Sequence, residues 1–196
     1  MPRKKSVKHS AVWFQDAVDS VVSFATTASR GQADEHVSWI YCFAVIRLYR
    51  DFEALVLDAL VGAVNNDTTT IAATTGIDFP AHLTDEVCEF LITGTGYFDF
   101  KGRSGLIKTI KAFVPEGHYL LTAVKQDKYR EALDALCALR NFAAHESDKS
   151  KRAVLDALQI ERISSSGAWL KRQERLKWLA NRLKSLAADF HAGAPY

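Results

Sequence analysis

The stretch WIYCFAVIRLYRDFEALVLDALVGAV, residues 39–64, is the longest apolar run of the chain and decides its fold class. It is long enough to cross a membrane, but it contains charged side chains at Arg47, Arg50, Asp51, Glu53 and Asp58. Charges inside a bilayer are costly. We therefore predict a long helix, from about residue 36 to residue 64, that is buried in a globular protein rather than in a membrane. The turn signal NND then ends it.

Apolar side chains recur at helical spacing in several other segments. The helices expected there cover about residues 12–28, residues 84–92 with Thr84 as N-cap, residues 105–113, residues 126–145, and a terminal stretch from about Ser166. The pattern is least regular between residues 65 and 122. We expect one domain over residues 1–196, an all-α helical bundle with an irregular, variable insertion at residues 65–122 and a flexible basic tail at residues 1–10.

The charge balance argues against a protein that binds nucleic acid through its overall charge. The 25 Lys and Arg residues nearly offset the 23 Asp and Glu residues, which leaves a formal net charge of +2, so any basic surface must be local. Cys42, Cys88 and Cys137 are far apart and form no CxxC pair, so we expect reduced core cysteines, no metal site and no cofactor. No apolar segment follows the basic N-terminus as a secretory signal requires, and we expect a cytoplasmic location.

The segment LRNFAAHES, residues 139–147, holds the strongest candidate site. Arg140 presents a permanent cation whose geometry suits phosphate oxygens, and His145 can exchange a proton near neutral pH. RNA carries its own nucleophile, the 2′-hydroxyl, so a base, an acid and a positive charge suffice for its cleavage without a metal ion. The spacing alone is a weak signal, because two other pairs share it approximately: Arg3 with His9, and Arg30 with His36. Only Arg140 and His145 lie at the end of a long apolar helix.

The hexapeptide RNFAAH resembles the RNxxAH form of the Rx4-6H motif of the HEPN superfamily, whose members are small helical domains and include many metal-independent endoribonucleases. A second similarity lies upstream. The segment LYRDFEALVLDAL, residues 48–60, has an aromatic residue followed by a glutamate, as related stand-alone HEPN families do. The resemblance extends to the fold, which is then expected to be a HEPN-like helical bundle.

The resemblance also assigns roles to individual residues. It implies that Arg140 contacts the scissile phosphate, that His145 is the general acid or base, and that Asn141 is the polar residue after the arginine. Glu53 matches the upstream glutamate and is expected to orient Arg140 or Asn141 through a hydrogen bond. The structural alternative for Glu53 is a buried pair with one of three arginines: Arg47, Arg50 or Arg140.

Helical geometry constrains how Arg140 and His145 can meet. Positions five apart are separated by about 500° around a helix, which is roughly 140° from a shared face. Either the helix ends or distorts close to His145, which the following HESDKSK favours, or a second chain completes the site. The resemblance implies the second arrangement as well, because HEPN nucleases typically form their sites where two copies of the motif meet in a homodimer.

Weaker candidates for RNA binding lie in the segment GYFDFKGRSGLIKTIK, residues 96–111. Lys101, Arg103 and Lys108 alternate there with aromatic residues, a composition that suits single-stranded RNA. The alternative interpretation is a loop whose aromatic side chains fill the core.

The leading hypothesis is a metal-independent endoribonuclease, a toxin or defence effector, that acts on RNA as a homodimer and is paired with an antitoxin or other partner protein. The alternative is a non-catalytic HEPN module that binds RNA, a nucleotide or a partner protein. A third hypothesis is an all-helical scaffold protein without a role in nucleic-acid binding. The intact set of Arg140, Asn141 and His145 favours catalysis.

Overall fold

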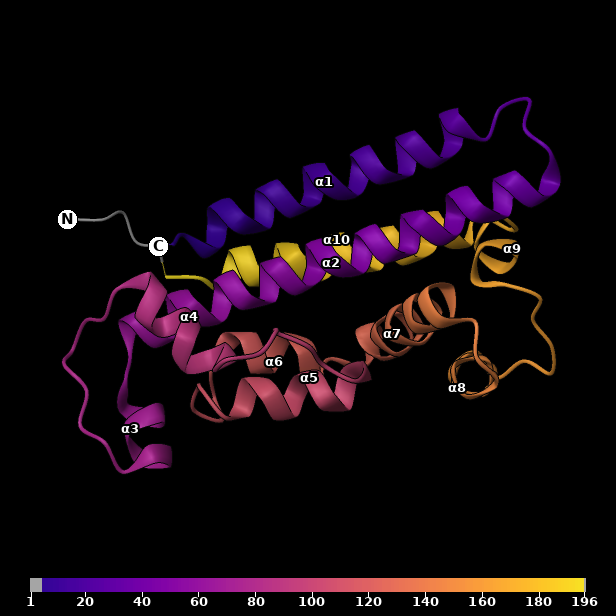
Figure 1. Cartoon of the computed structure of the whole chain (residues 1–196). Coiled ribbons are helices and arrows are strands. Elements are labelled where there is room, and N and C mark those ends of the chain that lie inside the picture. Colours follow the sequence, from indigo (N-terminus) through magenta and orange to yellow (C-terminus); the bar gives the residue numbers. More distant parts are fainter. Residues whose placement is uncertain (1–4, 196) are drawn as a thin grey trace.

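The computed structural model describes residues 5–195 as an all-α bundle built around one long central helix (Figure 1). That helix, α2, covers Asp34–Asn66. Two further long helices, α1 (Val7–Ala28) and α10 (Arg175–Gly193), pack against α2 and against each other. Within the described residues there is no β-strand. The predicted all-α class is confirmed.

Shorter helices complete the bundle. They are α3 (Thr69–Thr75), α4 (Asp85–Thr93), α5 (Gly102–Lys111), α6 (Tyr119–Lys125), α7 (Arg130–His145), α8 (Asp148–Leu158) and α9 (Ser166–Leu170). Helices α7 and α9 pack on α2, while α8 and α5 pack on α7 (Figure 1). Helix α7 is therefore enclosed from several sides along its middle, and both of its ends reach the surface.

The central helix forms where the apolar run predicts it, with small differences at its ends. It begins at Asp34 rather than residue 36 and ends at Asn66 rather than residue 64. Most of its residues from position 48 onward are buried, and Leu48, Phe52 and Leu60 have no exposed surface. Burying a side chain of this size contributes about 1.5–3 kcal/mol, so this half of α2 is the main source of core stability. None of the helices in the described part of the chain is long and apolar enough to cross a membrane.

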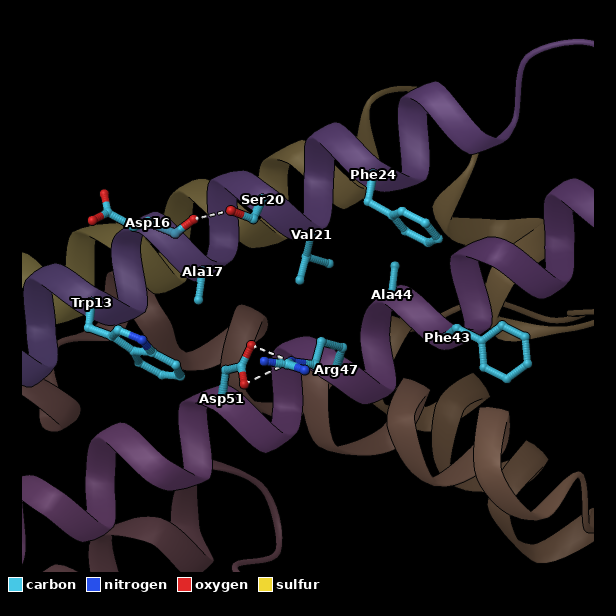
Figure 2. A pocket seen from close by; sticks show the side chains of 10 residues that line it. All are labelled: Trp13, Asp16, Ala17, Ser20, Val21, Phe24, Phe43, Ala44, Arg47 and Asp51. Carbon is cyan, nitrogen blue, oxygen red and sulfur yellow. Dashed lines mark hydrogen bonds and ion pairs between the residues drawn. The ribbon is translucent and has the colours of Figure 1, made fainter.

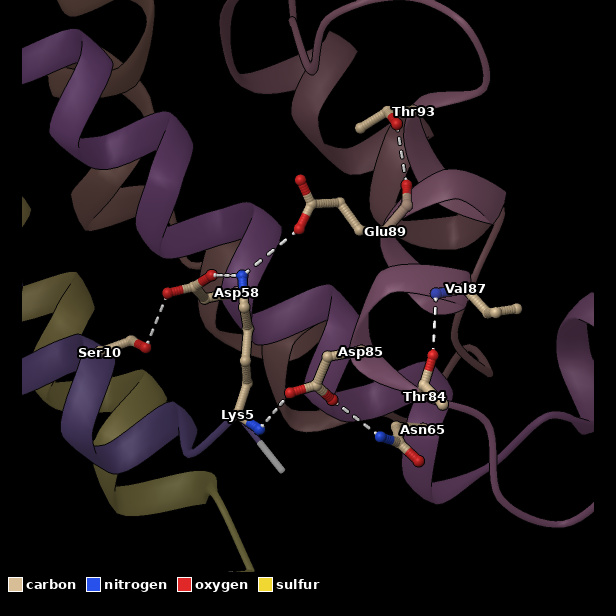
Figure 3. A network of polar contacts seen from close by, with 9 residues as sticks. All are labelled: Lys5, Ser10, Asp58, Asn65, Thr84, Asp85, Val87, Glu89 and Thr93. Carbon is tan, nitrogen blue, oxygen red and sulfur yellow. Dashed lines mark hydrogen bonds and ion pairs between the residues drawn. The ribbon is translucent and has the colours of Figure 1, made fainter. Parts of the chain in front are cut away.

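The start of α1 is anchored by a polar network, which differs from the expected tail at residues 1–10 (Figure 3). Residues 1–4 lie outside the described part of the chain. The ammonium of Lys5 pairs with Asp58 of α2, and its backbone N–H donates to Asp85 of α4 at 2.8 Å. Asp58 also accepts a hydrogen bond from Ser10 at 2.9 Å. Residues 7–10 are therefore the first turn of α1, which begins five residues before the predicted residue 12.

The middle segment, residues 65–122, is more helical than expected. It contains α3, α4 and α5 and the start of α6. Thr84 caps α4 as predicted, because its hydroxyl accepts from the N–H of Val87. Helix α5 begins at Gly102, three residues before the predicted start, and α6 had no predicted counterpart. The predictions failed where helices are short, because a helix of seven residues shows only two turns of periodicity.

The C-terminal region also departs from the prediction. The expected single helix from Ser166 is two helices, α9 and α10, because Gln173 and Glu174 adopt the left-handed conformation, with φ of 53° and 56°. The motif helix α7 begins at Arg130 rather than at residue 126, after a 3₁₀ turn at Asp127–Tyr129.

Candidate functional site

The three residues of the RNxxAH segment occupy the last two turns of α7. Helix α7 ends at His145, as the sequence predicts. Glu146 follows in the left-handed conformation, with φ of 45°, and its N–H donates to the carbonyl of Phe142 at 3.0 Å. Ser147 then caps α8 in a capping box with Ser150. This tight turn fixes His145 at the junction of α7 and α8, where its side chain is exposed.

Buried contacts hold the backbone of α7 next to the motif. The hydroxyl of Ser166, at the start of α9, donates to the carbonyl of Leu139 at 2.7 Å, and Ser166 has no exposed surface. Leu139 and Phe142 are buried on the opposite side of the helix from solvent. Because Arg140 follows Leu139 directly, its Cα position is set by the packing of α7 against α9.

The side chain of Arg140 is half-buried and held by two neighbours. Its guanidinium carbon lies 4.4 Å from the centre of the Tyr49 ring, a cation–π contact. Its Nη1 donates to Oδ1 of Asn141 at 2.8 Å, and Nδ2 of Asn141 in turn contacts the sulfur of Cys137 at 3.8 Å. In this arrangement Asn141 orients the guanidinium through its carbonyl oxygen.

Two carboxylates lie beside this arginine. The hydroxyl of Tyr49 donates to Asp99 at 2.8 Å and also to the carbonyl of Phe100 at 3.0 Å. Glu53 is one helical turn after Tyr49 on α2, so the two share a face. Burial raises the pKa of Glu53 to about 7, and the positive charge of Arg140 opposes that rise. Burial likewise raises the pKa of Tyr49.

The structure decides between the arginine partners considered for Glu53. Nε of Arg47 pairs with both oxygens of Asp51, at 2.9 and 2.8 Å, on the face of α2 that meets α1. Glu53 points to the other face, where Arg140 is the arginine whose charge acts on it. Among the described residues Glu53 and Arg140 form no direct ion pair, so their interaction acts through space rather than through a hydrogen bond.

An open cavity of about 920 Å³ lies between α7, α8 and the loop before α5. Arg140, Asn141 and His145 all border it, as do Asp99 and Lys101. Arg140 and His145 both border this cavity although they are five positions apart, and α7 ends at His145. Across the described chain no hydrogen bond or ion pair joins Arg140 to His145. Each is therefore available to a ligand in the cavity.

The cavity wall carries charges of both signs. Lys101, Lys149 and Arg140 are its cations, and Asp99, Asp134 and Asp156 are its carboxylates. His145 stands at the C-terminus of α7, where the helix dipole favours a positive charge. The arrangement offers a fixed cation for an anionic group and, near the rim, an exposed imidazole that can give or take a proton.

The three weaker RNA-binding candidates have different surroundings. Lys101 borders the site cavity. Arg103 donates from Nε to the carbonyl of Val124 at 2.9 Å and from Nη2 to that of Lys125, so its guanidinium closes the C-terminal end of α6. Lys108 is exposed on α5, and the described cavity lining does not include it. The aromatic residues of this segment differ in exposure: Phe100 is buried, whereas Tyr97 is 96% exposed.

Tyr49 and Asp99 are site residues that sequence reasoning did not identify. Tyr49 stands four residues before Glu53, and that spacing on one helix was a usable signal for a shared face. Asp99 lies in the loop at residues 94–101, which no periodic pattern places in space. Only the packing of that loop on α2 and α7 brings Asp99 to Tyr49.

A separate groove of about 580 Å³ runs between α1 and α2 (Figure 2). Its aromatic side chains, Trp13, Phe24 and Phe43, are between 46% and 67% exposed. Its charged pair, Arg47 and Asp51, is satisfied internally. The groove is thus apolar in character and offers no reactive group comparable with the histidine of the α7 cavity.

The chain matches no known protein family, no curated protein and no solved structure. The likeness to HEPN proteins therefore rests on the RNxxAH segment, the upstream glutamate and the helical layout.

Replacing Glu53 by Gln is expected to change how stability depends on pH. The folded pKa of about 7 lies above the usual 4.5, so the folded state binds more protons than the unfolded state between these values. Stability contributed by protonated Glu53 is therefore lost as the pH rises through that window. Glu53→Gln mimics the protonated form, and we expect it to be more stable than wild type at about pH 8, on the order of 1–2 kcal/mol after solvent screening.

Urea unfolding at about pH 5 and about pH 8 measures this effect. Glu131→Gln, an exposed glutamate of α7, is the matched control and is expected to unfold like wild type at both values. A Glu53→Gln protein that is less stable than wild type at the higher pH would show that Glu53 is a structural anion instead.

Proposed function

We propose that this protein is a metal-independent endoribonuclease of the HEPN type, with its site in the α7 cavity. The observation that carries the proposal is that one cavity is bordered both by an arginine with a fixed orientation and by an exposed histidine. Arg140 is fixed by Tyr49 and Asn141, while His145 is exposed at the rim. These two residues belong to the hexapeptide that resembles the RNxxAH motif.

The proposed reaction is an internal transfer of a phosphodiester. The 2′-oxygen of a ribose attacks the adjacent phosphorus and loses its proton to a base, and the bond from phosphorus to the 5′-oxygen breaks. The leaving 5′-oxygen takes a proton from an acid, which yields a 2′,3′-cyclic phosphate and a 5′-hydroxyl. Arg140 stabilises the negative charge that grows on the non-bridging oxygens. His145 performs one of the two proton transfers.

The neighbours of Arg140 act on its position. Asn141 accepts from the guanidinium, donates one amide N–H to the sulfur of Cys137 and leaves its other amide N–H for a phosphate oxygen. The Tyr49 ring lies against the guanidinium of Arg140, and the Tyr49 hydroxyl donates a hydrogen bond to Asp99. A fixed fork of donors loses less entropy when it binds phosphate than a mobile lysine does. Glu53 supplies negative charge near the arginine only when it is ionised, above about pH 7.

The second proton transfer points to a homodimer. One His145 cannot serve as base and acid at once, and its exposure leaves it able to meet a second copy of the motif. We expect light scattering to give twice the mass of the 21.8 kDa chain at micromolar concentration. A monomer that still cleaves RNA under the same conditions would contradict this part of the proposal.

The same resemblance leads us to propose a cytoplasmic toxin or defence effector that an antitoxin or other partner protein holds in check. The alternative function is a non-catalytic module that binds RNA, a nucleotide or a partner protein. The three aspartates in the cavity wall favour the partner-protein form of that alternative, because carboxylates repel phosphate. RNA cleavage by the purified chain separates the two.

The test is incubation with a single-stranded RNA and with DNA of the same sequence, both in excess EDTA. We expect cleavage of RNA alone, because DNA lacks the 2′-hydroxyl nucleophile, and we expect EDTA to leave the rate unchanged. Equal cleavage of DNA, or activity that EDTA abolishes and Mg²⁺ restores, would overturn the proposed mechanism.

A further inference from the structure

A second cavity, of about 510 Å³, lies where the connector after α8 meets the junction of α9 and α10. Three of its lining side chains are arginines: Arg162, Arg172 and Arg175. Among the described residues that line it, none is acidic. It differs in this respect from the α7 cavity, whose wall mixes lysines with aspartates. We call it the arginine cavity.

Two of these arginines flank the junction between α9 and α10. Gln173 and Glu174 are consecutive non-glycine residues in the left-handed conformation. This conformation costs on the order of 1 kcal/mol for each of them. Arg172 and Arg175 stand on either side of this break. Both side chains border the cavity, next to Trp169 of α9.

Arg175 and Trp169 form a fixed wall. The guanidinium carbon of Arg175 lies 4.5 Å from the centre of the indole ring. Its Nη1 donates to the carbonyl of Trp169 at 3.3 Å, and its Nη2 to Gln173 at 2.5 Å. The arginine is therefore oriented by neutral partners and keeps its full charge for a ligand.

Arg162 and Arg172 are exposed, and neither forms an ion pair with any residue between 5 and 195. Two nearby carboxylates already pair with lysines, and one of them, Asp34, also acts on Arg172 through its charge. Asp34 pairs with Lys171 at 2.6 Å, and Glu174 pairs with Lys177 at 2.5 Å. Three arginines without a direct ion pair among the described residues make this cavity a site of concentrated positive charge in a chain whose overall charge is nearly balanced.

The arginine cavity is close to the proposed catalytic cavity along the chain. Gln159 borders the α7 cavity and Ile160 borders the arginine cavity. Consecutive Cα atoms are about 3.8 Å apart, so the linings of the two cavities adjoin at the C-terminal end of α8. A polyanionic strand that leaves Arg140 over this end of α8 arrives at the three arginines.

We infer that the arginine cavity binds the phosphates of single-stranded RNA next to the cleaved bond, as a second contact for the substrate. Arginines bind phosphate oxygens in pairs of hydrogen bonds, and an indole provides a surface for a base. This inference rests on the proposed function for its choice of RNA as the polyanion. It adds a substrate path from Arg140 to Arg162, Arg172 and Arg175.

The test measures binding and cleavage separately. Binding uses fluorescence anisotropy with a labelled RNA of about 12 nucleotides whose 2′-oxygens are methylated, so that it cannot be cleaved. The variant is Arg162→Gln with Arg172→Gln, two exposed positions whose change leaves the core intact. Arg182→Gln, an exposed arginine of α10 outside the cavity, is the matched control.

We expect the double variant to bind the RNA at least about tenfold more weakly, with a salt slope smaller by about 1.4, as the loss of two phosphate contacts requires. Cleavage of a dinucleotide, which is too short to reach the arginine cavity, is expected to stay unchanged. The control is expected to match wild type in all three measurements.

Wild-type affinity and salt slope in the double variant would overturn the inference, whatever the cleavage rate. Displacement of the RNA by a mononucleotide at equal phosphate concentration would overturn it too, because the site would then be a nucleotide pocket. A wild-type protein that binds RNA through these arginines but cleaves none of it would refute the proposed nuclease and leave the binding site standing.

Discussion

The His145→Ala variant is expected to lose RNA cleavage by about 100- to 10,000-fold, the contribution typical of a general acid or base. Its melting temperature should stay near that of wild type. His145 is the last residue of α7, its side chain is exposed, and within residues 5–195 no hydrogen bond holds it. Removing the imidazole therefore takes away a proton carrier and almost no packing.

Arg140→Ala is expected to reduce cleavage by about 100- to 1,000-fold, because the phosphate loses its main cation. This variant also loses the contact with Tyr49 and leaves Glu53 without a nearby positive charge. The pKa of Glu53 should consequently rise further. Arg140→Lys keeps the charge but not the planar fork, and we expect its rate to fall between those of wild type and Arg140→Ala.

The chain provides its own control for both variants. Arg30 and His36 have nearly the same spacing, but Arg30 lies on the turn after α1 and His36 in the first turn of α2, and both are exposed. Arg30→Ala and His36→Ala should cleave RNA at the wild-type rate. Wild-type cleavage by His145→Ala would refute the mechanism and favour the binding module, whereas equal losses in all four variants would point to a non-specific effect on folding.

Gly167→Ala is expected to cause the largest loss of stability among the Gly→Ala substitutions of this protein. A Cβ at Gly167 would lie 1.8 Å from the carbonyl oxygen of Ser38 and 3.0 Å from the backbone nitrogen of Cys42. Both are backbone atoms of α2, so no side chain can move aside. Helices α9 and α2 would have to separate, and we expect a cost of more than about 3 kcal/mol.

Thermal unfolding checks this expectation, with a predicted fall in melting temperature of roughly 10 °C or an insoluble product. Gly105→Ala is the matched control. Gly105 lies within α5, where an added Cβ would approach Lys101 no closer than 3.4 Å, and alanine favours the helix by about 1 kcal/mol. Equal melting temperatures for Gly167→Ala and wild type would show that α9 does not pack against α2 as described.

The fold was predictable where helices are long and apolar. The periodicity of residues 39–64 is enough to define α2, and the charges within it exclude a membrane span. The same reasoning failed at the N-terminus, where α1 begins because Lys5 and Ser10 meet Asp58, a residue 48 or more positions away. It also failed at Gln173 and Glu174, since neither residue type signals a left-handed backbone. Contacts between distant segments decide such features, and local patterns do not contain them.

Part of the candidate site was likewise predictable from the sequence, and part was not. Arg140, Asn141 and His145 were found from one hexapeptide, and Glu53 from the second similarity. Tyr49 and Asp99 come to Arg140 only through the packing of α2 and the loop before α5 on α7. Mixed charges in the cavity wall likewise arise from three separate segments. A motif names the reacting groups, whereas tertiary packing sets their orientation and pKa.

The chemical ends of the RNA fragments test the central claim most directly. Purified wild-type protein is incubated with a single-stranded RNA in EDTA, and the products are analysed by mass spectrometry. Attack by the 2′-oxygen, assisted by Arg140 and His145, predicts fragments that end in a 2′,3′-cyclic phosphate and begin with a 5′-hydroxyl. Fragments with a 3′-hydroxyl and a 5′-phosphate, or RNA that stays intact, would contradict it.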